Sequence, residues 1–471
     1  MKTSHLLLAL ATSLCVFSAN QAQENAANII PNYGPVANQI IESAKKENDS
    51  YIKLQELCDD IGHRLSGSPS LDQAIAWAQK SMKDDGQENV RAEAVTIRKW
   101  VRGDESCELI EPRPMKINML GLGWSIGTPA EGITAEVISV KSKSELDALP
   151  DEAIKGKIVL FDYPMARYSE TDGAGYGDAV QYRSNGASWA AQRGGVAALV
   201  RSVTAYSLDS PHTGAMRYDA EVKKIPAAAI SVESAMMISR LQKRGKKCVV
   251  KLVMNAKDMG EAPSANVIAE IVGSEKPEEV VLIGGHIDSW DVGQGAQDDG
   301  AGCVAAMEAL NILRKLNLKP KRTIRVVLWT NEENGLAGAR SYAARHQNDD
   351  HVAGIESDSG GFKPQGLTID AQDEEKSQIA LDQLTEILAL LKPIGATRAK
   401  PGYSGADVGQ LKPLGAMCMG LTVDGRLYFN THHTNADTVD KVNPKELTEC
   451  AITLAVAAYV IADMPSRLGE N

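Results

Sequence analysis

Residues 280–299 read VVLIGGHIDSWDVGQGAQDD and carry the strongest structural signal in the chain. The four apolar residues at the start predict a buried strand, and Gly284–Gly285 predicts a break into a tight turn that presents His286 and Asp288. The adjacent acids Asp298–Asp299 come next, before a glycine-rich helix start. Imidazole and carboxylate groups at the end of a strand are typical of a zinc site. An ordinary strand-to-helix loop with solvated acids fits this stretch equally well, so other segments have to distinguish the two interpretations.

Length and charge limit the class of protein. The 471 residues are enough for two domains, and a 43% hydrophobic fraction is typical of globular proteins. The formal net charge is -11 and the pI is near 5.4. Both values argue against nucleic acid or an anionic membrane surface as a partner.

The N-terminus has the pattern of a secretory signal peptide, which we assign to residues 1–22. A short polar start precedes the apolar run Leu6–Phe17, and small residues follow it. The run is too short for a permanent membrane anchor, and a retained helix is the alternative. No later stretch is long and apolar enough for a membrane helix. We therefore expect an exported protein, periplasmic or extracellular, without membrane attachment after cleavage.

The rest of the chain divides into three segments. Residues 24–127 predict a helix at 36–60, a helix beginning at Ser68-Pro69 and a strand at 90–100, and form the first part of the main domain. Residues 128–256 contain many short β-like runs and predict an inserted β-rich module. In residues 257–471, strand-like and helix-like segments alternate. This alternation predicts an α/β fold with a mostly parallel central sheet covered by helices. The expected strands are 267–272, 280–283, 322–329, 352–356 and 417–422, and the expected helices are 300–318, 335–345, 374–391 and 444–461.

Four loops of the last segment bring His or acidic residues to the ends of predicted strands. In a parallel sheet these ends meet at one edge, where ligands bind. The loops begin after residues 283, 329, 356 and 422 and contain His286 with Asp298, Glu332–Glu333, Asp358, and His432–His433. No CxxC pair is present, which excludes a thiolate zinc site. Two imidazoles, two terminal carboxylates and a bridging carboxylate suit two zinc ions, and one acid of Glu332–Glu333 is left to act as a base.

These loops resemble the co-catalytic zinc exopeptidases that include bacterial leucyl-type aminopeptidases and glutamate carboxypeptidases. The resemblance covers most of the mature chain. It rests on GGHIDSWDVGQGAQDDGAG (284–302), VVLWTNEENGLAGA (326–339), ESDSGG (356–361) and HHTNADT (432–438).

The resemblance implies a role for each site residue. The metal ligands are His286, Asp298 as the bridge, Glu333, Asp358 and His433. Glu332 is the general base, Asp288 orients His286, and the Asp298–Asp299 peptide is cis. His433 is preferred to His432 because only His433 begins the pattern His-Thr-x-x-Asp-Thr of the family.

Two further segments have counterparts in the family. Residues 156–161, 194–198 and 225–227 resemble a protease-associated domain, whose role is to frame or cover the active-site cleft. Residues 403–407 resemble a substrate-pocket loop, which makes Tyr403, Ser404 and Asp407 candidate substrate contacts. The alternative is that Ser404 or Asp407 caps a helix that starts at Val408.

The resemblance implies hydrolysis of dipeptides or short unblocked peptides in the manner of a carboxypeptidase. An aminopeptidase with the same two zinc ions is the first alternative, and a non-catalytic, receptor-like relative is the second. All five ligands and the base are present, which disfavours the second. Related enzymes form homodimers, so the resemblance also implies a homodimer.

Overall fold

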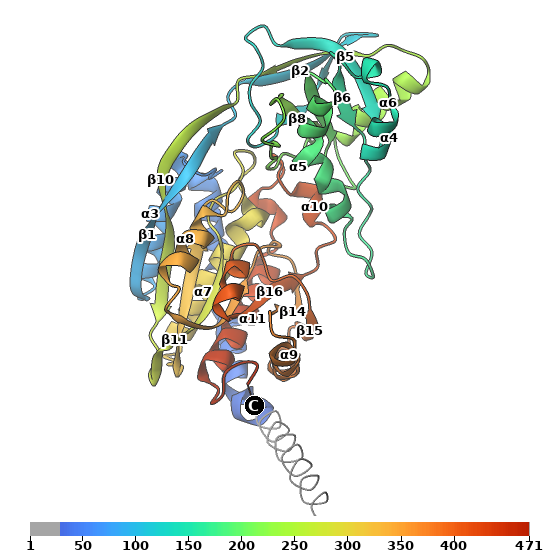
Figure 1. Ribbon diagram of the computed structural model, residues 1–471. Helices are drawn as coiled ribbons and strands as arrows, with labels where there is room; N and C mark the ends of the chain where they lie inside the picture. Colours follow the sequence, from blue (N-terminus) through green and yellow to red (C-terminus); the bar gives the residue numbers. More distant parts are fainter. Residues whose placement is uncertain (1–28, 471) are drawn as a thin grey trace, which may run out of the picture.

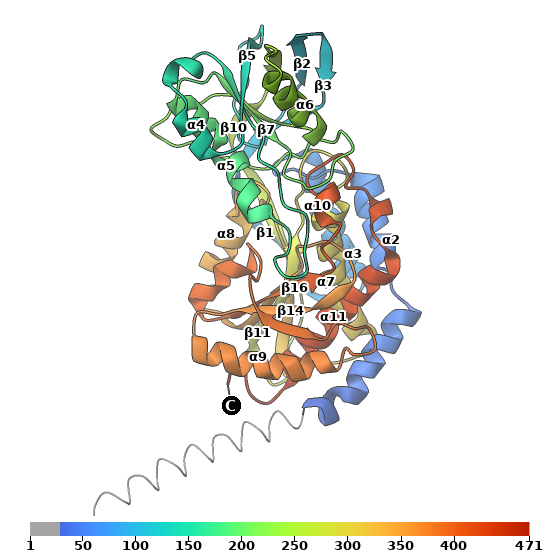
Figure 2. The same ribbon diagram turned by 90° about the vertical axis from the view of Figure 1, so that its right-hand side faces the viewer.

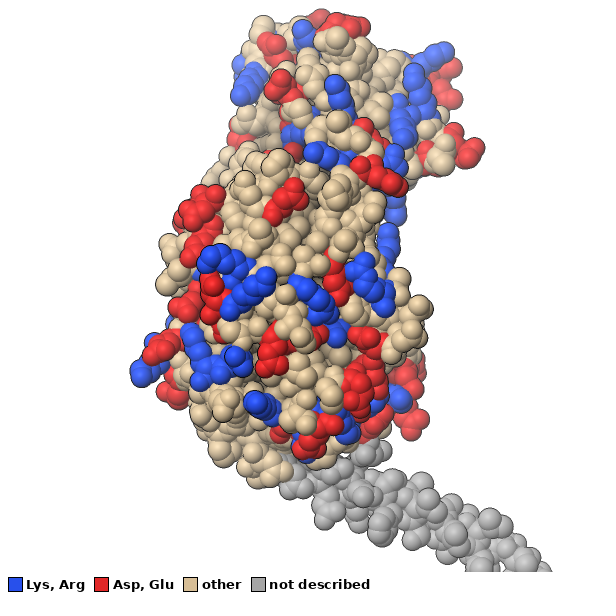
Figure 3. Space-filling model, turned by 90° about the vertical axis from the view of Figure 1, so that its left-hand side faces the viewer, with Lys and Arg blue, Asp and Glu red and all other residues tan. Residues whose placement is uncertain are grey.

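The computed structural model describes residues 29–470, and the signal peptide assigned to residues 1–22 lies outside this range. The chain forms two lobes, a large one with both described ends of the chain and a smaller second lobe above it (Figure 1). Each lobe contains an eight-stranded sheet. The described part has no helix long and apolar enough to cross a membrane. On the face in Figure 3, positive and negative side chains are interspersed over the large lobe.

The sheet of the large lobe has the order β1-β10-β12-β11-β13-β16-β14-β15. Its central strands β12, β11, β13 and β16 are parallel, whereas β1, β10 and β14 each pair antiparallel with a neighbour. The sheet is mixed, with four parallel and three antiparallel strand pairings. The long antiparallel strands β1 and β10 lead to and from the second lobe (Figure 1). The bounds are β1 Glu88–Val101, β10 Lys257–Ile271, β11 Lys276–His286, β12 Arg322–Trp329, β13 Asp350–Glu356, β14 Pro364–Asp370, β15 Arg398–Pro401 and β16 Met417–Val423.

The glycine pair in β11 does not break the strand, contrary to the sequence prediction. Strand β11 continues to His286, and Gly284 and Gly285 pair with Val327 and Leu328 of β12. A Cβ on Gly284 would lie 2.1 Å from Val327 O, and one on Gly285 would lie 2.2 Å from Asp299 Oδ2. Gly284 thus allows close packing against β12, and Gly285 allows close packing against η3 (Ala296–Gly300). His286 is therefore held by a strand rather than by a turn.

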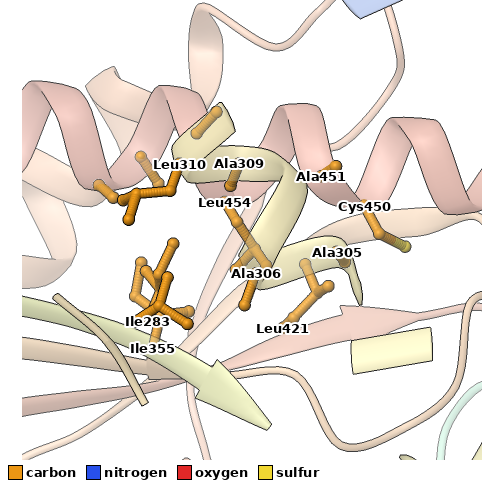
Figure 4. Close-up of a cluster of buried hydrophobic side chains, with 14 of the residues drawn as sticks. Ile283, Ala305, Ala306, Ala309, Leu310, Ile355, Leu421, Cys450, Ala451 and Leu454 are labelled. Atoms are coloured by element: carbon orange, nitrogen blue, oxygen red, sulfur yellow. The ribbon is translucent and has the colours of Figure 1, made fainter. Parts of the chain in front are cut away.

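Helices cover both faces of this sheet. On one face α7 (Ala301–Lys315) and α11 (Pro444–Asp463) pack on Ile283, Ile355 and Leu421 (Figure 4). On the other face α8 (Ala337–Arg345) and the 3₁₀ turn η4 (Val408–Leu414) pack on Ile268 and Leu282. The remaining elements of the lobe are a helix at 29–46, α2 Ser50–Gln55, η1 Glu56–Ile61, α3 Pro69–Asp84, η3 Ala296–Gly300, α9 Glu374–Ala389, α10 Tyr428–Thr431 and η5 Val439–Lys441.

Several helix starts follow capping rules. Helix α3 begins at Pro69, as the sequence predicts, and the Ser68 hydroxyl accepts a hydrogen bond from Leu71 N. The Asn443 side chain caps α11 in the same way, before Pro444 at its first position. The single helix predicted at 36–60 is instead divided among the helix at 29–46, α2 and η1.

The second lobe begins earlier in the chain than the predicted boundary at residue 128. Strands β2 and β4 belong to its sheet, in the order β3-β2-β9-β5-β6-β7-β8-β4, because β2 pairs with β9 and β4 with β8. The lobe also contains three helices, so it is α/β rather than only β-rich. The bounds are β2 Glu105–Glu111, β3 Met115–Ile117, β4 Met119–Gly121, β5 Ile133–Val140, α4 Lys143–Ala148, η2 Asp151–Ala153, β6 Ile158–Phe161, α5 Tyr176–Gln192, β7 Ala197–Arg201, β8 Ala227–Ile230, α6 Val232–Lys243 and β9 Val249–Met254.

Candidate metal centre

The five predicted metal ligands lie together at the carboxyl edge of the parallel strands. His286 ends β11, Glu333 follows β12, Asp358 follows β13, and His433 comes from the loop after β16. Asp298 lies in η3, at the start of α7. Asp358 is half-buried and the other four side chains are buried. The four polar loops identified in the sequence therefore converge in space.

Asp298 lies between two imidazole–carboxylate pairs. Its Oδ1 atom is 3.2 Å from His286 Nε2, and its Oδ2 atom is 3.1 Å from His433 Nε2. His286 Nε2 also lies 3.4 Å from Asp358 Oδ1. His433 Nε2 lies 3.1 Å from Glu333 Oε2. The arrangement has two half-sites that share the Asp298 carboxylate.

Asp299 differs from Asp298 although the two are adjacent. Asp299 Oδ2 accepts a hydrogen bond from His286 N at 3.0 Å, and Oδ1 accepts one from Gly302 N at 3.1 Å. The peptide between the two acids is cis, as the family resemblance implies. Although Asp299 is within reach of a metal ion shared with His286 and Asp358, both of its oxygens already bind main-chain amides. Asp299 therefore supports the site and Asp298 faces it.

Asp288 contacts His286 through its main-chain oxygen rather than through its carboxylate. His286 Nδ1 hydrogen-bonds to the Asp288 main-chain oxygen at 2.9 Å, whereas the nearest carboxylate oxygen is 4.0 Å away. The Asp288 carboxylate instead accepts hydrogen bonds from Glu332 N at 3.0 Å and Glu333 N at 3.3 Å. Asp288 thus holds His286 with its carbonyl and the two glutamates with its side chain.

The second lobe contacts His433 directly. His433 Nδ1 hydrogen-bonds to the Thr213 main-chain oxygen at 3.2 Å, which leaves Nε2 for the carboxylates. Thr213 N donates to the His433 oxygen at 3.0 Å. His432 stacks on His433 and its Nε2 is 3.6 Å from Asp298 Oδ2, but its Nδ1 has no hydrogen-bond partner among residues 29–470. These contacts favour His433 as the ligand, although His432 is also within reach.

The donor set fits divalent cations. Asp298 Oδ2 and Glu333 Oε1 are buried and accept no hydrogen bond within the described residues. Burial raises the pKa of Glu333 to about 7, and the Asp298 carboxylate contributes in the same direction. Burial likewise raises the pKa of Glu332 well above its ordinary value, and Asp358 and Glu333 raise it further. Positive ions between these groups would satisfy the unpaired oxygens, and imidazole with carboxylate ligands suits zinc.

A cavity of about 740 Å³ opens onto the cluster. One side is formed by Glu332 and four of the predicted ligands, Asp298, Glu333, Asp358 and His433. Another side is formed by Gln365, Arg398 and Lys400 of β14 and β15. The second lobe contributes residues 168–174 and Arg183. Figure 2 shows the loop before α5 reaching down toward β16 and β14. A volume of this size accommodates a small organic ligand or short peptide.

Arg183 is a cavity residue that the sequence did not single out. Its side chain comes from α5 and is 7% exposed. It donates to the Tyr176 hydroxyl at 2.8 Å and weakly to the Thr213 oxygen at 3.4 Å, while its Nε has no acceptor in the described part of the chain. No acidic side chain of residues 29–470 lies within 4.0 Å of it. A buried guanidinium without a carboxylate partner therefore lines the cavity that opens onto the acidic cluster.

The loop at 403–407 only partly follows the sequence prediction. Tyr403 and Ser404 line the cavity, whereas Asp407 is buried beside it, without a hydrogen-bond partner in the described structure. Neither Ser404 nor Asp407 caps η4, because Ser404 donates to Asp370 and Asp407 makes no capping bond. The cap is Glu356 of β13, which accepts hydrogen bonds from Ala406 N at 3.0 Å and Val408 N at 2.6 Å. This contact between distant segments leaves no local signal in the sequence.

Comparisons with known proteins agree with this geometry. Residues 266–458 match the model of peptidase family M28. Carboxypeptidase Q from Bos taurus is 43% identical, over 99% of this chain and 97% of the relative. Carboxypeptidase Q from Homo sapiens is 44% identical, over 94% of this chain and 92% of the relative. The structure of a peptidase M28 precursor from Shewanella amazonensis superposes with a TM-score of 0.87 at 36% identity, covering 92% of this chain and 98% of that chain. A zinc aminopeptidase from Bacillus subtilis shares the fold, with a TM-score of 0.62 at 18% identity, covering 89% and 95% of the two chains.

Proposed function

Because this chain belongs to peptidase family M28, we propose that its cavity holds two zinc ions and hydrolyses dipeptides or short unblocked peptides. The chain is a metallo-exopeptidase of the carboxypeptidase Q type. The observation that carries the two-ion proposal is the position of Asp298 between the two imidazole–carboxylate pairs. His286 and Asp358 serve one ion, His433 and Glu333 serve the other, and Asp298 serves both.

Zinc in such a site acts as a Lewis acid that polarises the scissile carbonyl and makes water a better nucleophile. The protein supplies the proton transfer. Glu332 lines the cavity beside the ligands without being one of them, a position that suits a group that takes a proton from water and returns it to the leaving amine. The Asp288 carboxylate holds the main chain of Glu332, which keeps the base in place.

Arg183 supports recognition of the carboxyl end of the substrate. A free α-carboxylate is the ion-pair partner that this buried guanidinium lacks within residues 29–470. Arg398 and Lys400 add positive charge to the same cavity. This arrangement favours a carboxypeptidase, or a dipeptidase that requires a free carboxyl end, over an aminopeptidase. Tyr403 and Ser404 are further substrate contacts in this proposal.

A panel of end-blocked dipeptides tests the proposal. The protein should hydrolyse free dipeptides and should lose most activity on dipeptide amides. Cleavage of N-acetylated dipeptides as well would show that a free amino end is not required. Arg183→Met should raise KM for free dipeptides by about 10-fold to 100-fold, since one charge-assisted hydrogen bond contributes about 1.5–3 kcal/mol. The rate on dipeptide amides should not change. Cleavage of amides but not of acetylated dipeptides would identify the aminopeptidase alternative.

Glu332→Gln serves as the inactive control. It keeps all five proposed ligands and should bind zinc like the wild type while losing about 10²–10⁴-fold in kcat, the usual contribution of a general base. A receptor-like relative that keeps the fold but has lost the metals would bind no zinc and cleave nothing in the whole panel.

The remaining sequence predictions are part of the same proposal. The second lobe corresponds to a protease-associated domain that covers the cleft, which is consistent with its residues in the cavity wall. The protein is exported to the periplasm or the extracellular space, and it forms a homodimer.

A further inference from the structure

Arg64 lies under the metal centre and has no acidic partner within 4.0 Å among residues 29–470. Its guanidinium is fully buried. It donates to the main-chain oxygens of Ile287 at 2.8 Å, Gln294 at 2.7 Å and Gly295 at 2.9 Å. A fourth hydrogen bond goes to Gly62 O at 2.9 Å. Four partners nearly exhaust the five donors of an arginine side chain.

Three of these acceptors belong to the loop that joins two proposed zinc ligands. Ile287 follows His286 directly, and Gly295 precedes Asp298 by three positions. Gly295 has a φ of +61°, and a Cβ there would lie 2.9 Å from Arg64 Nη2. Arg64 therefore holds both ends of the loop at once. Glycine is required at position 295 by its positive φ and by the close approach of Ser289, whose Cβ would lie 2.4 Å from an added Cβ, as well as of the guanidinium.

The opposite side of the loop is held by Asp437. Its carboxylate accepts hydrogen bonds from Gln297 N at 2.8 Å and Asp298 N at 3.2 Å, and its main-chain oxygen accepts one from Gln294 N at 2.7 Å. Asp437 lies four residues after His433. The loop is thus fixed between Arg64 and the segment that carries the other imidazole.

Ser66, two residues after Arg64, reaches the neighbouring loop. Its hydroxyl donates to Asp288 Oδ2 at 3.1 Å and accepts from Asn331 Nδ2 at 3.1 Å. Asp288 in turn binds the main chain of Glu332 and Glu333. The short segment 62–68, GHRLSGS, therefore contacts the loops after β11 and β12.

We propose that Arg64, assisted by Ser66, is a positioning residue that sets the separation of His286 and Asp298 before zinc binds. The inference rests on the proposed zinc site. Lysine cannot replace arginine in this role, because an ammonium group has three donors and no planar fork to span both ends of the loop. The effect should appear first in zinc affinity and only through it in turnover.

Zinc affinity of Arg64→Lys tests the role. The full-length wild type and variant are stripped of metal, and zinc affinity is measured by competition with a chromophoric chelator. Partners that orient metal ligands contribute about 10–100-fold to affinity, so we expect a loss in that range at one site or both. Added zinc should restore dipeptide hydrolysis by Arg64→Lys.

Arg322→Lys is the matched control. Arg322 is also fully buried and donates to main-chain oxygens, at Met464 and Pro465, although it additionally pairs with the Glu279 carboxylate. It lies at the opposite end of β12 from the metal centre. It should lose thermal stability and keep wild-type zinc affinity. Ser66→Ala provides a milder test if Arg64→Lys does not fold, with a smaller loss of affinity expected.

The outcomes are distinct. Wild-type zinc affinity in the folded Arg64→Lys protein, or in Ser66→Ala if only that variant folds, overturns the positioning role, as does an equal loss in Arg322→Lys. A wild-type protein that binds no zinc overturns the proposed function and the positioning role together.

Discussion

Asp298 and Asp299 illustrate how adjacent identical residues acquire different roles. The sequence marks both as candidate ligands. In the structure the two oxygens of Asp299 accept main-chain hydrogen bonds from His286 and Gly302, whereas Asp298 faces the two imidazoles. The distinction depends on main-chain amides that only the folded loop brings together. The family pattern selected Asp298, and spacing alone did not.

His432 and His433 are also adjacent identical residues, and substitution can show which of them binds zinc. His433→Ala removes the imidazole whose Nδ1 is held by Thr213, so we expect zinc content to fall from about two ions per chain to about one, with loss of most activity. His432→Ala should keep both ions and change kcat by less than about 10-fold. Metal content by atomic absorption and kcat on one dipeptide are the measurements. The reverse result, with zinc lost in His432→Ala and retained in His433→Ala, would exchange the two assignments.

At the scale of elements, periodicity located most of the α/β segment. Strand β12 has the predicted bounds, and β13, β16, α9 and α11 differ only at their ends. Strands β14 and β15 were not predicted. The exposed Arg398 and Lys400 in β15 give it the composition of a loop, and it becomes a strand only by pairing with β14.

The residues of the candidate site also divide into those that the sequence predicts and those that it does not. Motifs located the five proposed ligands and Glu332, because their side chains follow strands that the sequence shows clearly. Arg183, Arg64 and the Thr213 carbonyl were not found. Arg64 and Thr213 each contact a partner more than 200 residues away in the sequence, and Arg183 lines a cavity formed by several distant segments. Such contacts follow from the docking of lobes and loops rather than from local pattern.

Glu93 connects β1 to the end of α8 and makes stability depend on pH. Burial raises the pKa of Glu93, but hydrogen bonds from His346, Arg345 and Arg91 outweigh it and lower the pKa from 4.5 to about 2. The folded carboxyl thus has the lower pKa. Its contribution is complete above the unfolded value of 4.5 and is lost as the pH falls toward 2.

Replacement of this carboxylate should flatten the acid limb of the stability curve. Glu93→Gln should be about 1–3 kcal/mol less stable than wild type near pH 6. The difference should shrink between pH 4.5 and 2, as wild type loses its advantage. Denaturant titrations at a series of pH values measure it. If the difference in free energy of unfolding between the two proteins stays constant over this range, the charge of Glu93 does not contribute to stability.

At the scale of the whole molecule, the lobes are joined through the proposed active site. Thr213 exchanges two hydrogen bonds with His433, and Trp124 Nε1 donates to Asn334 O at 2.8 Å, next to Glu333. Arg102 pairs with Asp291, in the loop between His286 and Asp298. The contacts of the second lobe thus include three of the four loops that carry ligands.

Removal of zinc should therefore loosen both lobes. Zinc at about 1,000 times its Kd stabilises a protein by about 4 kcal/mol, so a chelator should lower Tm. Hydrogen exchange should increase around Thr213 as well as around His433, since the two are hydrogen-bonded. Calorimetry and exchange mass spectrometry with and without a chelator test this. Faster exchange confined to the large lobe would contradict the coupling.

The ladder between β1 and β10 determines how the second lobe can be exchanged. Trp100 pairs with Asp258 and Val101 with Lys257, so the chain leaves and re-enters the large lobe at neighbouring positions. Antiparallel partners are about 4.5–5.5 Å apart, a spacing that the two ends of a different hairpin-based module also satisfy. The ladder is therefore a natural graft junction at which a foreign domain leaves the register of the large lobe intact. A graft that restores hydrolysis must also present a carbonyl group where Thr213 now meets His433, which gives chimera design one atomic criterion beyond matching the ends.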